Sequence, residues 1–370
     1  MAKKKYDVDF NLDEFDEIEA ERELKKKKKN GKKKTSYIAY ILIFIFLFGI
    51  GLAIFLLYGP WSGFRDFWIT TAMTTKDHKY LATMLYSDDF ITNVLENNRV
   101  IEPSEDTDID LIDINDSFFS SNSYKDEYDK QILDREEGAI YKYIKLDDYS
   151  FDAYLVAVYD PSKISLVHTK YLGVKGQYLV DMARENNALV AINGSAFRDA
   201  GGQGNGGQPK GIIIEDGKII QSSRNLSYGG GVIGFTNDNK LYLGRVTAKE
   251  ALKAGVRDGV EFGPYLVVNG KSMVVKGNGG YGIHPRTAIG QRKDGIVLFL
   301  VVDGRRVDSI GATIKDLADI MIKYGAYNAS NLDGGNSSAL VINNKLVNRP
   351  INWSNMEQTR PIATGFIVTE

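Results

Sequence analysis

The chain has 370 residues and a formal net charge of −2, and it contains no cysteine and three histidines. Hydrophobic residues make up 43% and charged residues 25%, which is typical of folded proteins and excludes a wholly disordered chain. The lack of cysteine excludes disulfide frameworks, cysteine-ligated metal sites and thiol nucleophiles. We expect no nucleic-acid partner, because nucleic-acid-binding domains concentrate lysine and arginine.

An uncharged segment near the N-terminus, Tyr37–Tyr58, is long enough to cross a membrane. A helix of 22 residues spans a bilayer core of roughly 30 Å. Lysines at 25–29 and 32–34 precede this segment, whereas only Arg65 lies close after it. The positive-inside rule therefore predicts a single-pass signal anchor in the cell membrane, with 1–36 as a charged cytoplasmic tail and the C-terminal part extracellular. A cleaved signal peptide is less expected, since the apolar run is long and no A-x-A site follows it.

Helical spacing of apolar residues predicts helices in 62–100, and residues 101–138 are polar and acidic. Together they would form a juxtamembrane helical stalk and acidic linker, 59–138. Strands are expected at 139–144, 153–158, 188–192, 296–302, 329–332, 338–342 and 362–368. Helices are expected at 176–185 and 313–324, the second with Thr313 and Asp316 as a capping box and Gly325 just past its end. This order predicts an α+β (mixed α/β) fold in which one large domain, 139–370, has a mixed β-sheet and flanking helices.

Polar residues gather where the expected strands end. They lie in four segments, 193–197, 284–288, 303–305 and 331–338, and two arginines, Arg349 and Arg360, follow near the C-terminus. Taken singly, each has a plain structural explanation, since Asp-Gly is an ordinary turn pair. The glycine-rich loops at 201–207 and 277–282 lack the phosphate-loop spacing, and no G-x-S-x-G nucleophile motif is present.

Taken together, these segments form an ordered set of motifs. They are AINGSAF at 191–197, PKGIIIEDGKI at 209–219, HPRTAIG at 284–290, VVDGR at 301–305, NLDGGNSSALVINNKLVNRP at 331–350 and TRPIATGFIV at 359–368. With these motifs, the chain from about residue 152 to its end resembles the phosphodiester glycosidase family. The resemblance implies hydrolysis of a sugar that is linked through its anomeric carbon to a phosphodiester. One departure is Ser195, where the family more often has glycine, and we expect it to narrow the pocket or to change the sugar preference.

The resemblance suggests roles for the polar residues. Asp303 and Asp333 are the candidate carboxylates for an oxocarbenium-like transition state, and His284 is the candidate general acid. Arginines could hold the phosphate through bidentate contacts, and glycine amides could approach an anion or a sugar hydroxyl. The candidate substrate-binding residues are Asn193, Ser195, Arg286, Arg305, Asn331, Gly334, Gly335, Asn336, Ser337, Arg349 and Arg360.

The sequence predicts a membrane-anchored extracellular hydrolase that cleaves a GlcNAc-1-phosphodiester-like linkage in an envelope or exopolysaccharide glycan. Its partners would be that carbohydrate phosphodiester and the membrane. A non-catalytic glycan-binding or envelope-assembly protein with the same fold is an alternative, and so is a metal-dependent phosphodiesterase that cleaves the P–O bond. No metal or cofactor is expected, although the Asp and Asn cluster offers the oxygen ligands that calcium prefers. The sequence leaves the oligomeric state open, since no sustained heptad is present.

Overall fold

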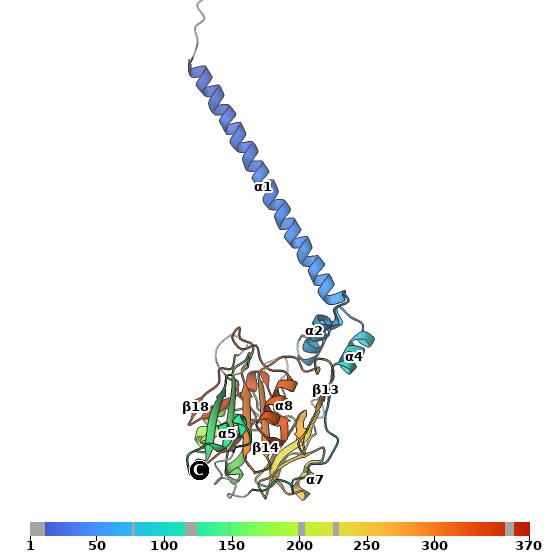
Figure 1. The fold of residues 1–370 in the computed structure, drawn as a ribbon, viewed down its shortest axis with the longest axis vertical. Helices are drawn as coiled ribbons and strands as arrows, with labels where there is room; N and C mark the ends of the chain where they lie inside the picture. Colours follow the sequence, from blue (N-terminus) through green and yellow to red (C-terminus); the bar gives the residue numbers. More distant parts are fainter. Residues whose placement is uncertain are drawn as a thin grey trace, which may run out of the picture. The chain divides into compact units, whose positions relative to one another are not determined.

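The computed structural model describes residues 12–75, 78–114, 124–147, 149–198, 204–224, 229–351 and 359–370. These residues belong to two compact units, Met1–Arg65 and Asp66–Glu370. In the first unit, α1 (Leu12–Tyr58) is one helix of 47 residues (Figure 1). It begins well before the apolar segment, because pairs such as Lys25–Glu21 and Lys27–Glu23, at i,i+4 spacing, support helix in the charged part.

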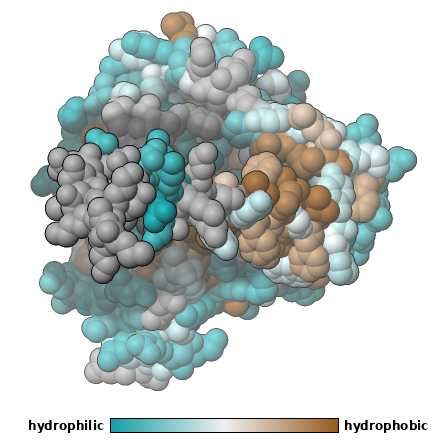
Figure 2. Space-filling view, turned by 90° about the horizontal axis from the view of Figure 1, so that it is seen from above, coloured by the Kyte–Doolittle hydropathy of each residue, from teal (hydrophilic) through white to brown (hydrophobic). Residues whose placement is uncertain are grey.

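The segment Tyr37–Tyr58 has a mean hydropathy of 2.9 and is not buried. Among the described residues it is the one helix that is long and apolar enough to cross a membrane. Figure 2 shows its apolar side chains as a continuous hydrophobic surface. The finding fits the predicted anchor by length and composition.

The second unit contains three main β-sheets around a shared hydrophobic core (Figure 1). The large sheet has the strand order β12-β11-β16-β14-β15-β3-β2. Its strands are β2 (Tyr141–Leu146), β3 (Ala153–Val158), β11 (Tyr265–Val268), β12 (Lys271–Ser272), β14 (Arg286–Arg292), β15 (Val297–Val302) and β16 (Ala326–Asn331). One face of β15 supplies Val297, Phe299 and Val301 to the shared core, and the alternate residues face the other side.

Two five-stranded sheets complete the core. The C-terminal sheet has the order β18-β17-β5-β19-β4 and consists of β4 (Ile164–His168), β5 (Val190–Asn193), β17 (Leu340–Ile342), β18 (Lys345–Leu346) and β19 (Thr364–Val368). The middle sheet has the order β7-β6-β10-β8-β9 and consists of β6 (Ile213–Glu215), β7 (Lys218–Gln221), β8 (Gly231–Thr236), β9 (Leu241–Gly244) and β10 (Val256–Phe262). Ile192 from the former and Ile233 from the latter meet Phe299 in the same apolar cluster.

Helices cover the outer faces of the sheets. α8 (Ile314–Lys323) packs on the large sheet, α6 (Leu179–Glu185) on the C-terminal sheet and α7 (Ala248–Lys253) on the middle sheet. α8 has the expected start, because the Thr313 side chain accepts from the Asp316 amide and the Asp316 carboxylate accepts in return from the Thr313 amide. It ends before Gly325, whose φ of 84° suits a residue without a Cβ.

The predicted fold class is confirmed, since helices flank sheets within one α+β unit. The strand pairs among the described residues run antiparallel, rather than in a sheet of mixed direction. The β–α–β order along the chain does not produce parallel pairs here, because several connections lead from one sheet to another. For example, β3 lies in the large sheet and β4, the next strand, lies in the C-terminal sheet.

The predicted stalk contains α2 (Ser62–Thr74), α3 (Tyr80–Thr83) and α4 (Asp88–Asn97), followed by β1 (Val100–Ile101), which pairs with β13 (Val274–Val275). The first acidic residues that follow are hydrogen-bonded to the sheets. The Glu102 carboxylate accepts from the Gly230 and Tyr265 amides, at 2.9 Å each, and Thr107 accepts from the Leu243 amide. The acidic segment therefore packs along the sheets through directed hydrogen bonds, which composition alone does not reveal. α5 (Glu127–Leu133) follows, with Ile132 buried against the large sheet.

Candidate active site

The polar segments that the sequence places at strand ends meet in the structure. Arg286 begins β14 and pairs with Val302 at the end of β15, so Asp303 follows at the same edge of the large sheet. Ala288 pairs with Asn331 at the end of β16, and the next residues form the glycine loop 333–337. This edge therefore joins the second, third and fourth polar segments.

The first polar segment reaches the same place from the C-terminal sheet. Asn193 ends β5, and its side-chain amide donates to the Asp333 carbonyl at 2.7 Å. Its oxygen accepts from Thr287 Oγ1 at 2.7 Å and from the Ala339 amide at 3.1 Å. Asn193 is 1% exposed and uses its hydrogen-bonding groups inside the protein. It holds the glycine loop in position.

The glycine loop lies between the segment that contains Arg286 and the segment that contains Arg305. The Gly335 amide donates to the Pro285 carbonyl at 2.9 Å, and a Cβ on Gly334 would lie 2.8 Å from that carbonyl oxygen. Gly335 has a φ of 63°, and a Cβ there would lie 3.2 Å from Arg305 Nη2. Glycine suits both positions, because a Cβ on Gly334 would press on the Pro285 carbonyl and the φ of Gly335 lies in the left-handed region.

Arg305 and Arg360 are both tied to this loop. Arg360 Nε donates to Ser337 Oγ at 3.0 Å, and its Nη2 lies 3.8 Å from Asp333 Oδ2. Arg305 donates from Nη1 to Asn336 Oδ1. Desolvation and the neighbouring Arg360 lower the pKa of Arg305, as expected where two cations face a common space.

Arg286 is the third cation of the cluster, and it is 7% exposed. Its Nη2 donates to the carbonyls of Tyr281 and Gly282 at 2.8 and 2.9 Å, and Nε donates to the Ala312 carbonyl. Burial lowers the pKa of Arg286 to about 10, and the charge of Arg305 acts in the same direction. A buried guanidinium held by neutral carbonyls favours an anion nearby. We call Arg286, Arg305 and Arg360 the arginine cluster.

His284 lies beside this cluster and is strongly affected by it. Burial, followed by the charges of Arg286 and Arg305, lowers the pKa of His284 to about 3. The imidazole is therefore neutral at pH 7. The predicted general-acid role assumed a pKa near neutrality, whereas burial and the two nearby guanidinium charges disfavour the protonated ring.

The two candidate aspartates differ in their surroundings. Asp303 is 1% exposed and accepts from Asn348 Nδ2 at 2.8 Å, the Arg349 amide at 2.7 Å and Tyr154 Oη at 3.2 Å. It also lies 3.5 Å from Arg306 Nη1. Burial raises the pKa of Asp303 despite these partners. Its contacts suit a structural clamp that fixes the 348–349 segment to the end of β15.

Asp333 lies within the glycine loop, and its side chain is 14% exposed. Its amide donates to the Gly194 carbonyl at 3.1 Å, which fixes the backbone while the carboxylate faces Arg360. Among the described residues, the structure thus brings Asp333 rather than Asp303 to the arginine cluster.

Three further predicted residues lie outside the cluster. Ser195 is 2% exposed and packs between β5 and β19, where its hydroxyl lies 2.8 Å from Thr364 Oγ1. Asn331 Nδ2 donates to the Gly263 carbonyl, which directs it toward the middle sheet. The Arg349 guanidinium lies 3.5 Å from Asp308 Oδ2.

The comparisons with known proteins place this geometry in a family. Residues 186–369 match the family model described as phosphodiester glycosidase. The chain carries a phosphodiester glycosidase domain. The arginine cluster, His284, Asp303 and Asp333 all lie within the matched residues of this domain. The resemblance noted in the sequence is confirmed.

Similarity to individual proteins agrees with the family match. The SPbeta prophage-derived uncharacterized protein YomE of Bacillus subtilis (strain 168) is 32% identical over 198 residues, covering 51% of this chain and 30% of that protein. The human N-acetylglucosamine-1-phosphodiester alpha-N-acetylglucosaminidase is 27% identical over 190 residues, covering 46% and 35% respectively. The chain thus spans about a third of the length of these relatives.

The solved catalytic domain of the zebrafish N-acetylglucosamine-1-phosphodiester alpha-N-acetylglucosaminidase, auto-inhibited by its pro-peptide, has the same fold. It superposes with a TM-score of 0.52 at 21% identity and covers 75% of this chain and 97% of that chain. A likeness at this identity establishes the fold of the phosphodiester glycosidase domain.

Sequence reasoning missed two contributors to the site. Phe197 lies under Arg360, with the guanidinium carbon 4.4 Å from the ring centroid, a cation–π contact that positions the cation. The position of Phe197, just after an expected strand and within a polar motif, could have indicated that it belongs to the site. The loop at 277–282, which the sequence offers only as a weak phosphate signal, instead supplies the carbonyls that hold Arg286.

That loop is fixed from outside by the helices of the predicted stalk. Asn98 Oδ1 accepts from the Asn278 amide at 2.9 Å, and Asn98 Nδ2 donates to Asp66 Oδ2 at 3.2 Å. Asn278 Nδ2 donates to Thr70 Oγ1 at 3.0 Å. The contacts made by Asn278 span 180 and 208 residues along the chain, so local sequence patterns do not reveal them.

Across the described parts of the chain, no group of three or more His, Asp or Glu side chains gathers as a potential ligand set. The carboxylates of Asp303 and Asp333 are instead directed at arginines.

Proposed function

We propose that this protein hydrolyses the bond between the anomeric carbon of a sugar and a phosphodiester oxygen. The observation that carries the proposal is the convergence of three arginines on a glycine loop that also bears Asp333. Such a site combines anion recognition with one carboxylate, the two features that glycosyl phosphodiester hydrolysis requires.

Arg305 and Arg360 would hold the phosphate oxygens through planar guanidinium contacts, and Arg286 would add a buried positive charge behind them. The same charges stabilise the negative charge that the phosphate gains as the C–O bond breaks. A leaving group stabilised in this way needs no proton from the enzyme. A neutral His284 is compatible with this mechanism and would serve as a hydrogen-bonding group.

The Asp333 carboxylate would stabilise the positive charge that develops at the anomeric carbon. The C1–O bond breaks with its electron pair going to the phosphate oxygen. Water supplies the hydroxyl that ends on C1, and its other proton goes to the phosphate or to solvent. The products are the free sugar and a phosphate monoester. Asp303 would act through position alone, because its oxygens are occupied by Asn348, the Arg349 amide and Tyr154.

The apolar segment of α1 supports a location at the cell membrane. With lysines preceding it, the positive-inside rule favours an extracellular domain, where the substrate would be an envelope or exopolysaccharide glycan with GlcNAc-1-phosphodiester-like linkages. The GlcNAc part of this proposal follows the name of the human relative.

The test uses the full-length protein in detergent with an alkyl N-acetylglucosamine-1-phosphodiester. We expect free N-acetylglucosamine to be released, and Asp333→Asn to reduce turnover by at least about a hundredfold. Asp319→Asn, on the exposed face of α8, is the matched control and should retain activity. No release of any sugar by a folded wild-type protein would refute the proposal and leave a glycan-binding role.

A further inference from the structure

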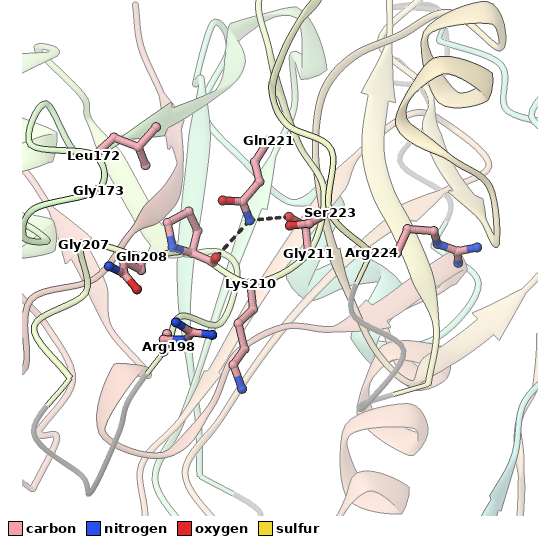
Figure 3. Close-up of a pocket in the computed structure, with 11 residues that line it drawn as sticks. Leu172, Gly173, Arg198, Gly207, Gln208, Lys210, Gly211, Gln221, Ser223 and Arg224 are labelled. Carbon is pink, nitrogen blue, oxygen red and sulfur yellow. Dashed lines mark hydrogen bonds between the residues drawn. The ribbon is translucent and has the colours of Figure 1, made fainter.

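A second cationic site lies beside the arginine cluster. It is a pocket of about 440 Å³ between the C-terminal and middle sheets (Figure 3). Its charged lining residues are Arg198, Lys210 and Arg224. Among the described residues that line it, none is acidic.

The backbone places two of these cations on one face of a short ribbon. The Arg198 amide donates to the Gln208 carbonyl at 2.6 Å, and the Lys210 amide donates to the Ala196 carbonyl at 2.8 Å. Phe197 and Pro209 form an antiparallel bridge between them. Side chains alternate along an antiparallel ladder and opposed residues share a face, so Arg198 and Lys210 project together, as Figure 3 shows.

The other face of the same ribbon belongs to the candidate active site. Phe197 projects there, and its ring carries the Arg360 guanidinium. The ribbon therefore has the contact between Phe197 and Arg360 on one face and the side chains of Arg198 and Lys210 on the other. A linear substrate held by Arg360 would have the pocket as its next cationic neighbour.

The pocket wall is rigid. Gln221 Nε2 donates to the carbonyls of Pro209 and Gly211, at 2.9 and 2.7 Å. A Cβ on Gly207 would lie 2.3 Å from the Lys175 nitrogen, so the chain can pass there only as glycine. Such a wall keeps its shape without a ligand, which lowers the entropy cost of binding.

A buried carboxylate near the pocket, Glu261, forms part of the wall. Glu261 is 1% exposed, accepts from the Ile212 amide at 3.1 Å and lies 3.4 Å from Arg224 Nε. It balances the charge of Arg224 but lies behind the pocket surface. Arg198 and Lys210 contribute positive charge to the pocket lining, which favours an anionic group.

We propose that this pocket is a second anion subsite that binds another phosphodiester of the same polymer, next to the one that is cleaved. The inference rests on the proposed function, which it extends from a single glycosyl phosphodiester to a polymer with repeated phosphodiesters. The arginine cluster holds the reacting phosphate, and the pocket favours substrates that are longer and carry a further negative charge.

The test compares two substrates with the full-length protein in detergent. One is an alkyl N-acetylglucosamine-1-phosphodiester, and the other is the same sugar attached through its phosphodiester to an oligomer of glycerol phosphate. We expect Arg198→Gln with Lys210→Gln to raise KM for the oligomer about tenfold and to leave kinetics on the small substrate unchanged. Lys249→Gln with Lys253→Gln removes two exposed charges from α7 and should change neither.

A direct binding measurement separates this inference from the proposed function. A fluorescent glycerol phosphate oligomer without sugar should bind the wild type, and binding should weaken about tenfold in the Arg198 and Lys210 double variant. That result would uphold the subsite even if no substrate were hydrolysed. Equal binding by the double variant and the wild type would overturn it, as would an equal loss of activity on both substrates.

Discussion

The most specific prediction concerns the charge of His284 and the stability of the protein at acid pH. Burial and the neighbouring arginines lower its pKa from 6.5 to about 3. In the unfolded chain the imidazole takes up a proton below about pH 6.5, whereas in the folded protein it does not until about pH 3. The unfolded state binds more protons across this window, so the folded state loses stability as the pH falls.

The magnitude follows from the width of the window. At about 1.4 kcal/mol per pH unit, the full displacement corresponds to roughly 4–5 kcal/mol, and the part between pH 6.5 and pH 4.5 to roughly 2–3 kcal/mol. His284→Gln cannot take up the proton and removes this contribution. At pH 7.5, where the imidazole is neutral in both states, any difference between variant and wild type measures packing alone and serves as the control.

The assay is urea denaturation of the wild type and His284→Gln in detergent at pH 7.5 and pH 4.5, followed by circular dichroism. We expect the wild type to lose about 2–3 kcal/mol more than the variant between these two values. Parallel losses in the two proteins would refute the proposed environment of His284. The same result would reopen the general-acid role, since a histidine with an ordinary pKa could donate a proton.

Three further changes test the site. Asp303→Asn should lower the free energy of unfolding by roughly 3 kcal/mol, because an amide faces hydrogen-bond donors that the carboxylate now satisfies; thermal unfolding measures this, and an unchanged midpoint would contradict the clamp role. Gly335→Ala should raise KM for the phosphodiester, because its φ of 63° and the 3.2 Å approach to Arg305 force the loop to move; unchanged kinetics would show that the loop does not set the spacing of the arginines. Asn98→Ala should raise KM several-fold with a smaller change in kcat, because it frees Asn278 and the loop that holds the buried arginine; a loss of stability at constant KM would assign Asn98 to folding only.

Features with local causes were predictable from the sequence. The capping box of Thr313 and Asp316 uses residues three apart, so it is visible in the sequence and present in α8. The continuous apolar run of β15 is buried on both faces, as such a run predicts. The apolar segment of α1 was equally easy to predict from the sequence.

The strands of the middle sheet were not predicted, for a physical reason. Its strands contain glycines and charged residues that weaken the usual strand pattern. A Cβ on Gly234 would lie 2.4 Å from the Asp258 carbonyl oxygen, so close strand packing excludes larger residues there. Asp258 itself is buried in β10 because Arg257 and the Asp216 amide bind its carboxylate. Such compensation depends on tertiary contacts.

The site was predictable by segment but not by residue. Asp303 and Asp333 each follow a strand and precede a glycine, so the sequence gives them equal claims. Contacts to Asn348 and Tyr154, 45 and 149 residues away, close off Asp303, whereas Asp333 faces Arg360. Long-range partners decide which carboxylate can meet a substrate.

The central claim is that the bond between carbon and oxygen is the one that breaks. Hydrolysis of an alkyl N-acetylglucosamine-1-phosphodiester in oxygen-18 water tests it most directly, with mass spectrometry of both products. The mechanism predicts the label on the anomeric hydroxyl of the sugar and none in the phosphate monoester. Label in the phosphate would show P–O cleavage and would contradict the role proposed for Asp333.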